Sequence, residues 1–210
     1  RFLINKGISD SNIIHTPHAN FDYYSNSLFV SSSTPKQIIG FFGTISKYKG
    51  IDRLLSAFSK LHKDYPNYKL LIAGKGDMHP YKELLKDIEN NVILYNRWID
   101  DEEVSEIIQQ IDFLVLPYID ASQSGVIPLA YSFEKPVIAT NVGGLSEQVT
   151  EETGILVEPN NEAQLIAAMA KLIDDYSLVQ DLGRTARQKS TLNNTWDKSL
   201  DILMTNILLS

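Results

Sequence analysis

The sequence predicts an α/β fold: a doubly wound parallel sheet of six strands, with extra helices after the last strand. Short apolar runs alternate with amphipathic stretches from residue 37 onward, as strands joined by crossover helices require. The apolar runs are continuous rather than alternating, which is typical of strands covered by helices on both faces. Hydrophobic residues make up 43% of the 210 residues, enough for a sizeable buried core.

The elements follow one another in a regular order. We expect strands over residues 37–43, 69–74, 91–96, 113–117, 136–141 and 154–159. Amphipathic helices are expected over 51–63, 162–174 and 178–189 and in a last stretch from Trp196 to Leu208. Asp100 followed by Glu103, and Asn161 followed by Gln164, are helix-start patterns. The apolar stripe of the last helix is expected to pack in the core or between domains.

The first 36 residues differ from the rest in composition. Residues 12–17 fit a single strand, and residues 25–35 are serine-rich, like a linker. We therefore expect a leader over 1–36 and a domain over 37–210. The chain opens at Arg1 without an initiator methionine, so we expect it to be part of a longer protein. No apolar run reaches the ~20 residues of a membrane span.

Charge and cysteine content exclude several functions. The net charge is −7, from 26 acidic and 19 basic residues, which disfavours nucleic acid as the main ligand. The chain has no cysteine, which excludes thiol catalysis and disulfides and is compatible with a reducing cytoplasm. His15, His18, His62 and His79 lack zinc-ligand spacing, so no metal is expected. Neither a Walker loop nor a hydrolase nucleophile elbow is present.

The loop after the first strand, residues 43–50, suits an anionic ligand. Ligands of parallel sheets bind at the carboxyl ends of the strands. Glycine permits close backbone approach at Gly43 and Gly50, and Lys47 and Lys49 supply positive charge. The alternative is that both lysines are solvated surface residues.

The loop after the second strand begins like a dinucleotide-binding fingerprint. His79 stands where the third glycine of that fingerprint belongs, so the nicotinamide signature fails. We expect Gly76 to adopt a glycine-only conformation in a tight turn and Gly74 to line the crevice.

The loop after the fourth strand, residues 117–128, is the most informative. Pro128 is tolerated only in the first turn of a helix, so the helix through Phe133 must begin near residues 124–127. Its free N–H groups would then face the crevice. Gly125 allows an anion to approach, and the neighbouring polar side chains offer neutral hydrogen bonds to a diphosphate and a sugar. A serine cap on a structural helix is the alternative.

Read together, these loops resemble the C-terminal, donor-binding domain of retaining GT-B glycosyltransferases, specifically group 1 (family four). The resemblance covers about residues 37–190. Its motifs are Phe41-Phe42-Gly43 with Lys49-Gly50, Leu70 to Gly76, Ile111 to Pro117, Ser124-Gly125, Lys135 to Thr140, Gly143-Gly144 with Glu147, and Gly154 to Val157.

The resemblance implies transfer of a sugar from a UDP- or GDP-type nucleoside diphosphate donor, with retention of configuration and without metal or cofactor. Such enzymes have two Rossmann-like domains, so 37–210 would be the nucleotide-sugar-binding half. The acceptor would be held by an N-terminal domain of the same chain, through which peripheral membrane contact could arise. A role in bacterial surface polysaccharide synthesis in the cytoplasm, at the inner face of the membrane, is expected. The fragment alone should be catalytically silent.

The resemblance also implies roles for individual residues. The donor diphosphate is expected to contact Gly43, Thr44, Lys47, Lys49, Ser124, Gly125 and Val126. Thr44 stands where the family has a basic residue, and Lys47 is the expected substitute. Ser122 and Ala130 stand where the family has two glutamates, the first on the donor sugar and the second on the ribose.

The resemblance also assigns residues to the sugar and to the nucleoside of the donor. Ser122 and Gln123 are expected to bind the sugar. The nucleoside is assigned to Gly74, Arg97, Trp98, Ile99 and Ala130, with Trp98 equally explained by packing. No residue is identified as catalytic. Two alternatives stay open: a non-catalytic GT-B-like binding or regulatory module, and another GT-B enzyme such as a sugar-nucleotide epimerase.

Overall fold

The computed structural model describes residues 6–9, 12–14, 16, 19–21, 24, 33–193 and 195–208. Within them a six-stranded parallel sheet runs in the order β3-β2-β1-β4-β5-β6. The strands are β1 Ile38–Phe42, β2 Lys69–Ala73, β3 Val92–Tyr95, β4 Phe113–Leu116, β5 Val137–Thr140 and β6 Gly154–Val157. All six lie inside the predicted ranges, and the doubly wound fold class is confirmed.

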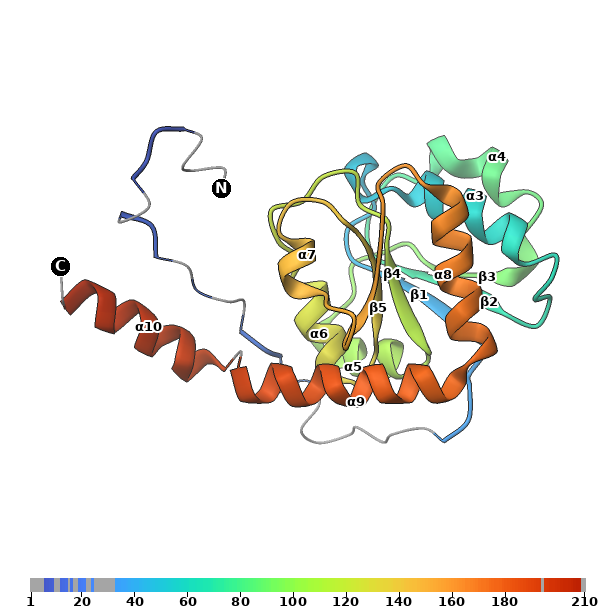
Figure 1. Cartoon of the computed structure of the whole chain (residues 1–210). Helices are drawn as coiled ribbons and strands as arrows, with labels where there is room; N and C mark the ends of the chain where they lie inside the picture. The colour runs from blue at the N-terminus through green and yellow to red at the C-terminus, as the bar shows by residue number, and fades with distance from the viewer. Residues whose placement is uncertain are drawn as a thin grey trace.

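Helices cover both faces of the sheet (Figure 1). The longer ones are α3 Ile51–Leu61, α5 Asp101–Gln109, α6 Val126–Ser132, α8 Glu162–Asp174, α9 Tyr176–Asn193 and α10 Trp196–Leu208. Short turns are η2 Lys47–Lys49, η3 His79–Tyr81, α4 Lys82–Leu85, η4 Glu89–Asn91 and α7 Leu145–Gln148. Helices α3 and α8 pack together on one face, whereas α5, α6 and α7 lie on the other.

The core explains why these segments form these elements. Strands β4 and β5 are buried at every position, which accounts for their unbroken apolar sequences. Helix α3 buries an apolar stripe at helical spacing: Ile51, Leu54, Leu55, Ala57, Phe58 and Leu61. Helix α5 starts with the predicted capping box between Asp100 and Glu103. Asn161 caps α8, but Gln164 turns its side chain to the Glu158 N–H instead of completing the box.

The last helix, α10, extends away from the sheet beyond the end of α9 (Figure 1). In α10 the apolar side chains Trp196, Leu200, Leu203 and Met204 are exposed, so they belong to no core of the described residues. Interdomain packing of this stripe therefore stays a prediction. A strand was expected over residues 12–17, but the described residues of this range form no strand. The serine-rich segment over residues 25–35 lies mostly outside the described residues.

Candidate functional site

The sheet reverses its winding between β1 and β4. The chain runs outward from β1 to β3 in one direction and from β4 to β6 in the other. In open parallel sheets the crevice at such a switch point is the usual ligand site. Here the loop after β1, residues 43–50, meets the loop after β4, residues 117–125. The Ile119 N–H donates to the Tyr48 carbonyl at 2.7 Å, which joins the two loops.

A cleft of about 640 Å³ opens between these loops. Its walls come from the end of β1, the turn η2, most of the second loop and the first turns of α6. The lining residues are Phe42, Tyr48, Lys49, Tyr118, Asp120, Ala121, Ser122, Gln123, Ser124, Gly125, Val126 and Leu129. Six of them were predicted from the sequence as site residues.

Lys49 carries the one strongly buried positive charge among the residues that line the cleft. It lies in η2 and is only 9% exposed, and burial lowers the pKa of its ammonium group. Its Nζ lies 5.3 Å from the ring centroid of Tyr118. No carboxylate among the described residues is paired with it. Since a buried charge is costly without a counter-ion, this position favours binding of an anion.

Tyr118 does not neutralise Lys49. Its ring is 2% exposed, and burial raises the pKa of its phenol to about 12, so it stays neutral near pH 7. The ring attracts the ammonium through its π face instead. Tyr48 meets the same ring edge-on with centroids 6.2 Å apart. Neither ring supplies a counter-charge, so the Lys49 ammonium group remains available to an anionic ligand.

Glycines let the strand ends approach closely at the cleft. Gly50 has a φ of 68°, and a Cβ there would overlap the carbonyl oxygen of Pro117 just beyond the end of β4. Gly43 has a φ of 115°, and the Lys49 Nζ occupies the space beside it. A side chain at either position would therefore disturb the placement of the lysine.

Near the start of α6, several backbone N–H groups are already hydrogen-bonded within the chain. Helix α6 begins at Val126, as Pro128 predicts, and has seven residues. The Val126 N–H donates to Ser124 Oγ at 3.3 Å, and the Ser124 N–H donates to Gln148 Oε1 at 2.8 Å. The N–H of Gly125 has no acceptor among the described residues. The helix start therefore offers fewer free N–H groups than the sequence analysis expected.

Other predicted diphosphate residues lie beside the cleft rather than in its wall. Gly43 borders the Lys49 ammonium. Thr44 and Lys47 are on the same loop and do not line the cleft. The described geometry therefore assigns the buried charge to Lys49 and gives Lys47 no defined role.

The predicted nucleoside residues do not line the cleft either. Arg97 forms an ion pair with Glu103, which raises the arginine pKa and lowers that of the carboxyl group. Trp98 is 72% exposed and Ile99 is partly buried against the core, so packing does not account for Trp98. Gly74 packs its backbone against Gly43.

Two expectations need correction. Ala130 is 0% exposed within the core, so its side chain reaches neither cleft nor solvent, because its face of α6 is turned toward the core. Gly76 has no positive φ; a Cβ there would instead overlap the Ile45 backbone, to which Gly76 is bridged. Glycine is therefore required at position 76 because the Ile45 backbone lies so close, and not because of a turn conformation.

Sequence reasoning missed Tyr48, Tyr118, Asp120 and Gln148. The first three lie in the two loops already singled out, and the place of Tyr48 between Lys47 and Lys49 was the one available signal among them. Gln148 lies in α7, 24 residues beyond Ser124, and its bonds to that residue have no sequence signature.

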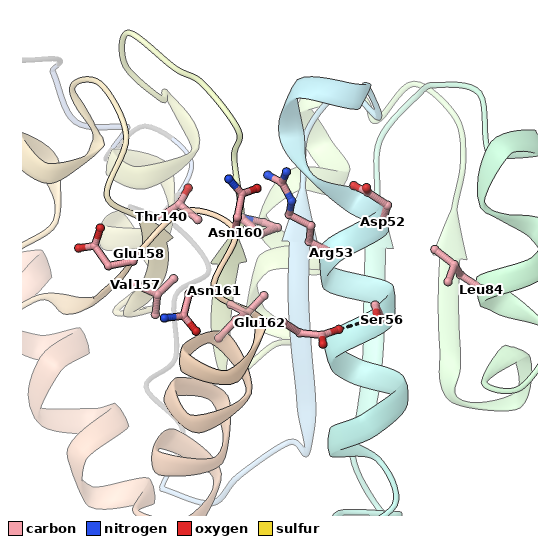
Figure 2. A pocket seen from close by; sticks show the side chains of 12 residues that line it. Asp52, Arg53, Ser56, Leu84, Thr140, Val157, Glu158, Asn160, Asn161 and Glu162 are labelled. Carbon is pink, nitrogen blue, oxygen red and sulfur yellow. Dashed lines mark hydrogen bonds between the residues drawn. The ribbon is translucent and has the colours of Figure 1, made fainter.

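A second hollow of about 380 Å³ lies across α3, between α4 and the start of α8 (Figure 2). Glu162 accepts hydrogen bonds there from Ser56 at 2.5 Å and from Lys60. Arg53 Nη1 is buried without a partner among the described residues. Asp52, Glu158 and Glu162 also line this hollow, so its charge is mixed. Its lining carries three carboxylates and one arginine, whereas the lining of the cleft at Lys49 carries one lysine and one carboxylate, Asp120.

Two further properties concern the described part of the chain. No three metal-ligating side chains come together in it. None of its helices is long and apolar enough to cross a bilayer.

Comparisons with known proteins agree with the fold. The family model described as Glycosyl transferases group 1 matches residues 36–175. The chain is 28% identical over 161 residues to glycogen synthase of Mycobacterium tuberculosis, covering 74% of this chain and 38% of that protein. It is 28% identical over 167 residues to the capsular polysaccharide biosynthesis glycosyltransferase CapM of Staphylococcus aureus, covering 72% and 40%.

A solved structure shows the same architecture. A mutant of S. aureus TarM, in complex with fondaparinux, alpha-GlcNAc-glycerol and UDP, superposes with a TM-score of 0.83 at 17% identity. The match covers 98% of this chain and 41% of that one. The chain thus spans about two fifths of the length of these relatives.

Proposed function

We propose that this chain, which belongs to the group 1 glycosyl transferases, is the donor-binding domain of a retaining hexosyltransferase. The proposed donor is a nucleoside diphosphate sugar of the UDP or GDP type, and the proposed role is bacterial surface polysaccharide synthesis. Acceptor binding is assigned to a part of the protein outside this chain. The proposal places the enzyme in the cytoplasm, with which the cysteine-free sequence is compatible.

The unpaired ammonium of Lys49 carries this proposal. It is buried at a cleft at the switch point of the sheet, with an aromatic ring rather than a carboxylate beside it. A diphosphate would supply the missing negative charge. The UDP in the TarM complex supports the donor class, and the name of CapM supports the role in polysaccharide synthesis.

The proposed chemistry is stabilisation of the leaving group. As the bond from the sugar to the diphosphate breaks, negative charge grows on the departing oxygen. Lys49 and the free N–H of Gly125 stabilise that charge, which lowers the barrier because the interaction strengthens in the transition state. Ser122 and Gln123, both exposed in the cleft, would bind sugar hydroxyl groups. The proposal includes no metal or cofactor and names no catalytic base in this chain.

Calorimetric titration of the 210-residue chain with UDP-glucose and with GDP-mannose tests donor binding. Wild type should bind at least one of them, and Lys49→Met should weaken that binding by about 10- to 100-fold, the effect of losing a charged hydrogen bond. Lys69→Met is the matched control, because Lys69 is exposed at the start of β2. Uridine and guanosine, which lack phosphates, should bind far more weakly than either sugar nucleotide.

Absence of binding by wild type to both nucleotide sugars would refute donor binding. The stereochemical part is tested separately, on an active preparation that contains this domain. NMR of its product should show the anomeric configuration of the donor, and inversion would contradict the proposal.

A non-catalytic binding module is the second candidate. The neutral side chains of Ser122 and Gln123, together with the burial of Ala130, favour it because the cleft loop then offers no catalytic carboxylate at those positions. Sugar transfer by an active preparation that loses activity with Lys49→Met would exclude this candidate.

A further inference from the structure

Gln148 binds both backbone groups of Ser124 in the cleft loop. Its Oε1 accepts from the Ser124 N–H at 2.8 Å, and its Nε2 donates to the Ser124 carbonyl at 3.0 Å. Gln148 ends α7, which follows β5, whereas Ser124 precedes α6. One side chain therefore ties the end of α7 to the connection between β4 and α6.

These bonds, together with one from the Ile127 N–H to the same Ser124 carbonyl at 3.3 Å, fix the direction of the next N–H group. The Ser124 carbonyl and the Gly125 N–H belong to one planar peptide, and in a trans peptide they point in opposite directions. The chain has no cis peptide among the described residues. Because the carbonyl points to Gln148, the Gly125 N–H points away from that side chain. It has no acceptor among the described residues, as is also true of the N–H groups of Asp120 to Gln123, but it is the one that shares a peptide with the carbonyl bound by Gln148.

The segment that carries Gln148 is itself held against the cleft loop. A Cβ on Gly143 would overlap the Ala121 carbonyl oxygen, and one on Gly144 would overlap that of Ser122. The Gly144 N–H donates to the Ala121 carbonyl at 3.3 Å. From the core side, the Tyr131 hydroxyl donates to the Gln148 carbonyl at 3.1 Å. The glutamine thus acts from a fixed support.

We propose that Gln148 is a positioning residue of the donor site, which holds the Ser124–Gly125 peptide so that the Gly125 N–H is presented to the donor diphosphate. The inference rests on the donor-binding function proposed above. Gln148 does not line the cleft and acts only through the loop.

Only a carboxamide can make both bonds. A carboxylate accepts from the Ser124 N–H but cannot donate to the carbonyl, and it places a negative charge against that oxygen. A methionine of similar length makes neither bond. The Ser124 carbonyl also accepts from the Ile127 N–H at 3.3 Å, so methionine leaves only the Ser124 N–H without a partner. Glutamate leaves neither group unpartnered but sets its charge against the carbonyl, so both replacements favour reorientation of the peptide.

The test compares UDP-glucose or GDP-mannose binding, whichever wild type binds, in Gln148→Met and Gln148→Glu. Both should raise the dissociation constant about tenfold, at a temperature well below unfolding. In wild type the amide ¹H–¹⁵N cross-peak of Gly125 should move on binding, and in Gln148→Met it should not. Gln110→Glu is the matched control, since Gln110 makes its side-chain bond to the Glu106 carbonyl in α5, and it should bind like wild type.

The outcomes separate this inference from the proposed function. Wild type that binds neither nucleotide sugar refutes donor binding itself. Wild type that binds, with both Gln148 variants within twofold of it, overturns the role of Gln148 alone. If Gln110→Glu weakened binding as much as the Gln148 variants do, the loss of affinity would be an effect of added charge. That result would also overturn the role of Gln148. If Gln148→Met does not fold, Gln148→Glu supplies the same comparison.

Discussion

The Nζ atom of Lys49 lies 5.3 Å from the ring centroid of Tyr118, and both side chains are buried at the cleft. The ring holds the cation without cancelling its charge. An aspartate or glutamate in its place would form an ion pair and compete with an anionic ligand. This arrangement leads to the first two predictions.

Removing the aromatic ring should weaken donor binding. We expect Tyr118→Leu to raise the dissociation constant for the bound nucleotide sugar about fivefold, since a partly buried cation–π contact contributes about 1 kcal/mol. Tyr118→Phe keeps the ring and should bind within twofold of wild type. Calorimetry measures both variants. Equal losses in the two would assign the effect to the hydroxyl, which lies 3.4 Å from Ser124 Oγ.

Lys49→Met should change binding and stability in opposite directions. The variant loses affinity, yet its thermal unfolding midpoint at pH 7 should rise, because a buried cation without a counter-ion is removed. The affinity of wild type should also fall as the pH rises through the lowered pKa of Lys49, since only the ammonium form attracts the diphosphate. Calorimetry from pH 7 to 10 checks this. A lower midpoint for Lys49→Met would contradict the unpaired charge.

Gly50→Ala should destabilise the domain by more than about 3 kcal/mol, as expected for severe overlap with backbone. Gly50 combines a φ of 68° with contact to the Pro117 carbonyl. Gly7 is the matched control: its φ is 85°, but no atom lies within 4 Å of an added Cβ. Gly7→Ala should cost at most about 1 kcal/mol. Urea unfolding measures the loss of stability in both variants. Similar losses would show that the positive φ, and not overlap with the Pro117 carbonyl, sets the cost.

Lys135 should make stability depend on alkaline pH. Burial lowers its pKa to about 8, although the nearby carboxylate of Asp112 opposes the shift. Between pH 8 and the ordinary lysine pKa of about 10.4, the unfolded chain binds more protons, so stability rises with pH. Relative to Lys135→Met, wild type should gain on the order of 2 kcal/mol from pH 8 to 10. If the difference in unfolding free energy between wild type and Lys135→Met stayed constant from pH 8 to 10, the lowered pKa of Lys135 would be contradicted.

Trp98 should report nucleoside binding. It is 72% exposed beside Arg97, in the loop assigned to the nucleoside. In Trp196→Phe, which leaves Trp98 as the only tryptophan, the bound nucleotide sugar should quench the fluorescence by stacking on the indole. In Trp98→Phe the remaining signal should not change. If binding quenched only the fluorescence of Trp196, the base would have to bind away from Trp98.

The strands and most helices could be predicted because their signals are local. Unbroken apolar runs such as Phe113–Leu116 fit a strand covered on both faces. Pro128 limited where α6 begins, and Asp100 marked the start of α5. The strand-to-helix loops could be singled out as site candidates, since the carboxyl ends of parallel strands share one edge. That the loops after β1 and β4 meet followed only from the strand order in the sheet.

The sequence by itself determined the α/β fold and the strand-to-helix loops as the place of a ligand site, because periodicity and capping are local properties. Tertiary structure decided what each residue does there. Burial turned Lys49 into an unpaired cation and withdrew Ala130 from the site. The bonds of Gln148 to Ser124 join residues distant in sequence. Burial and such contacts depend on how the elements pack, which no local pattern records.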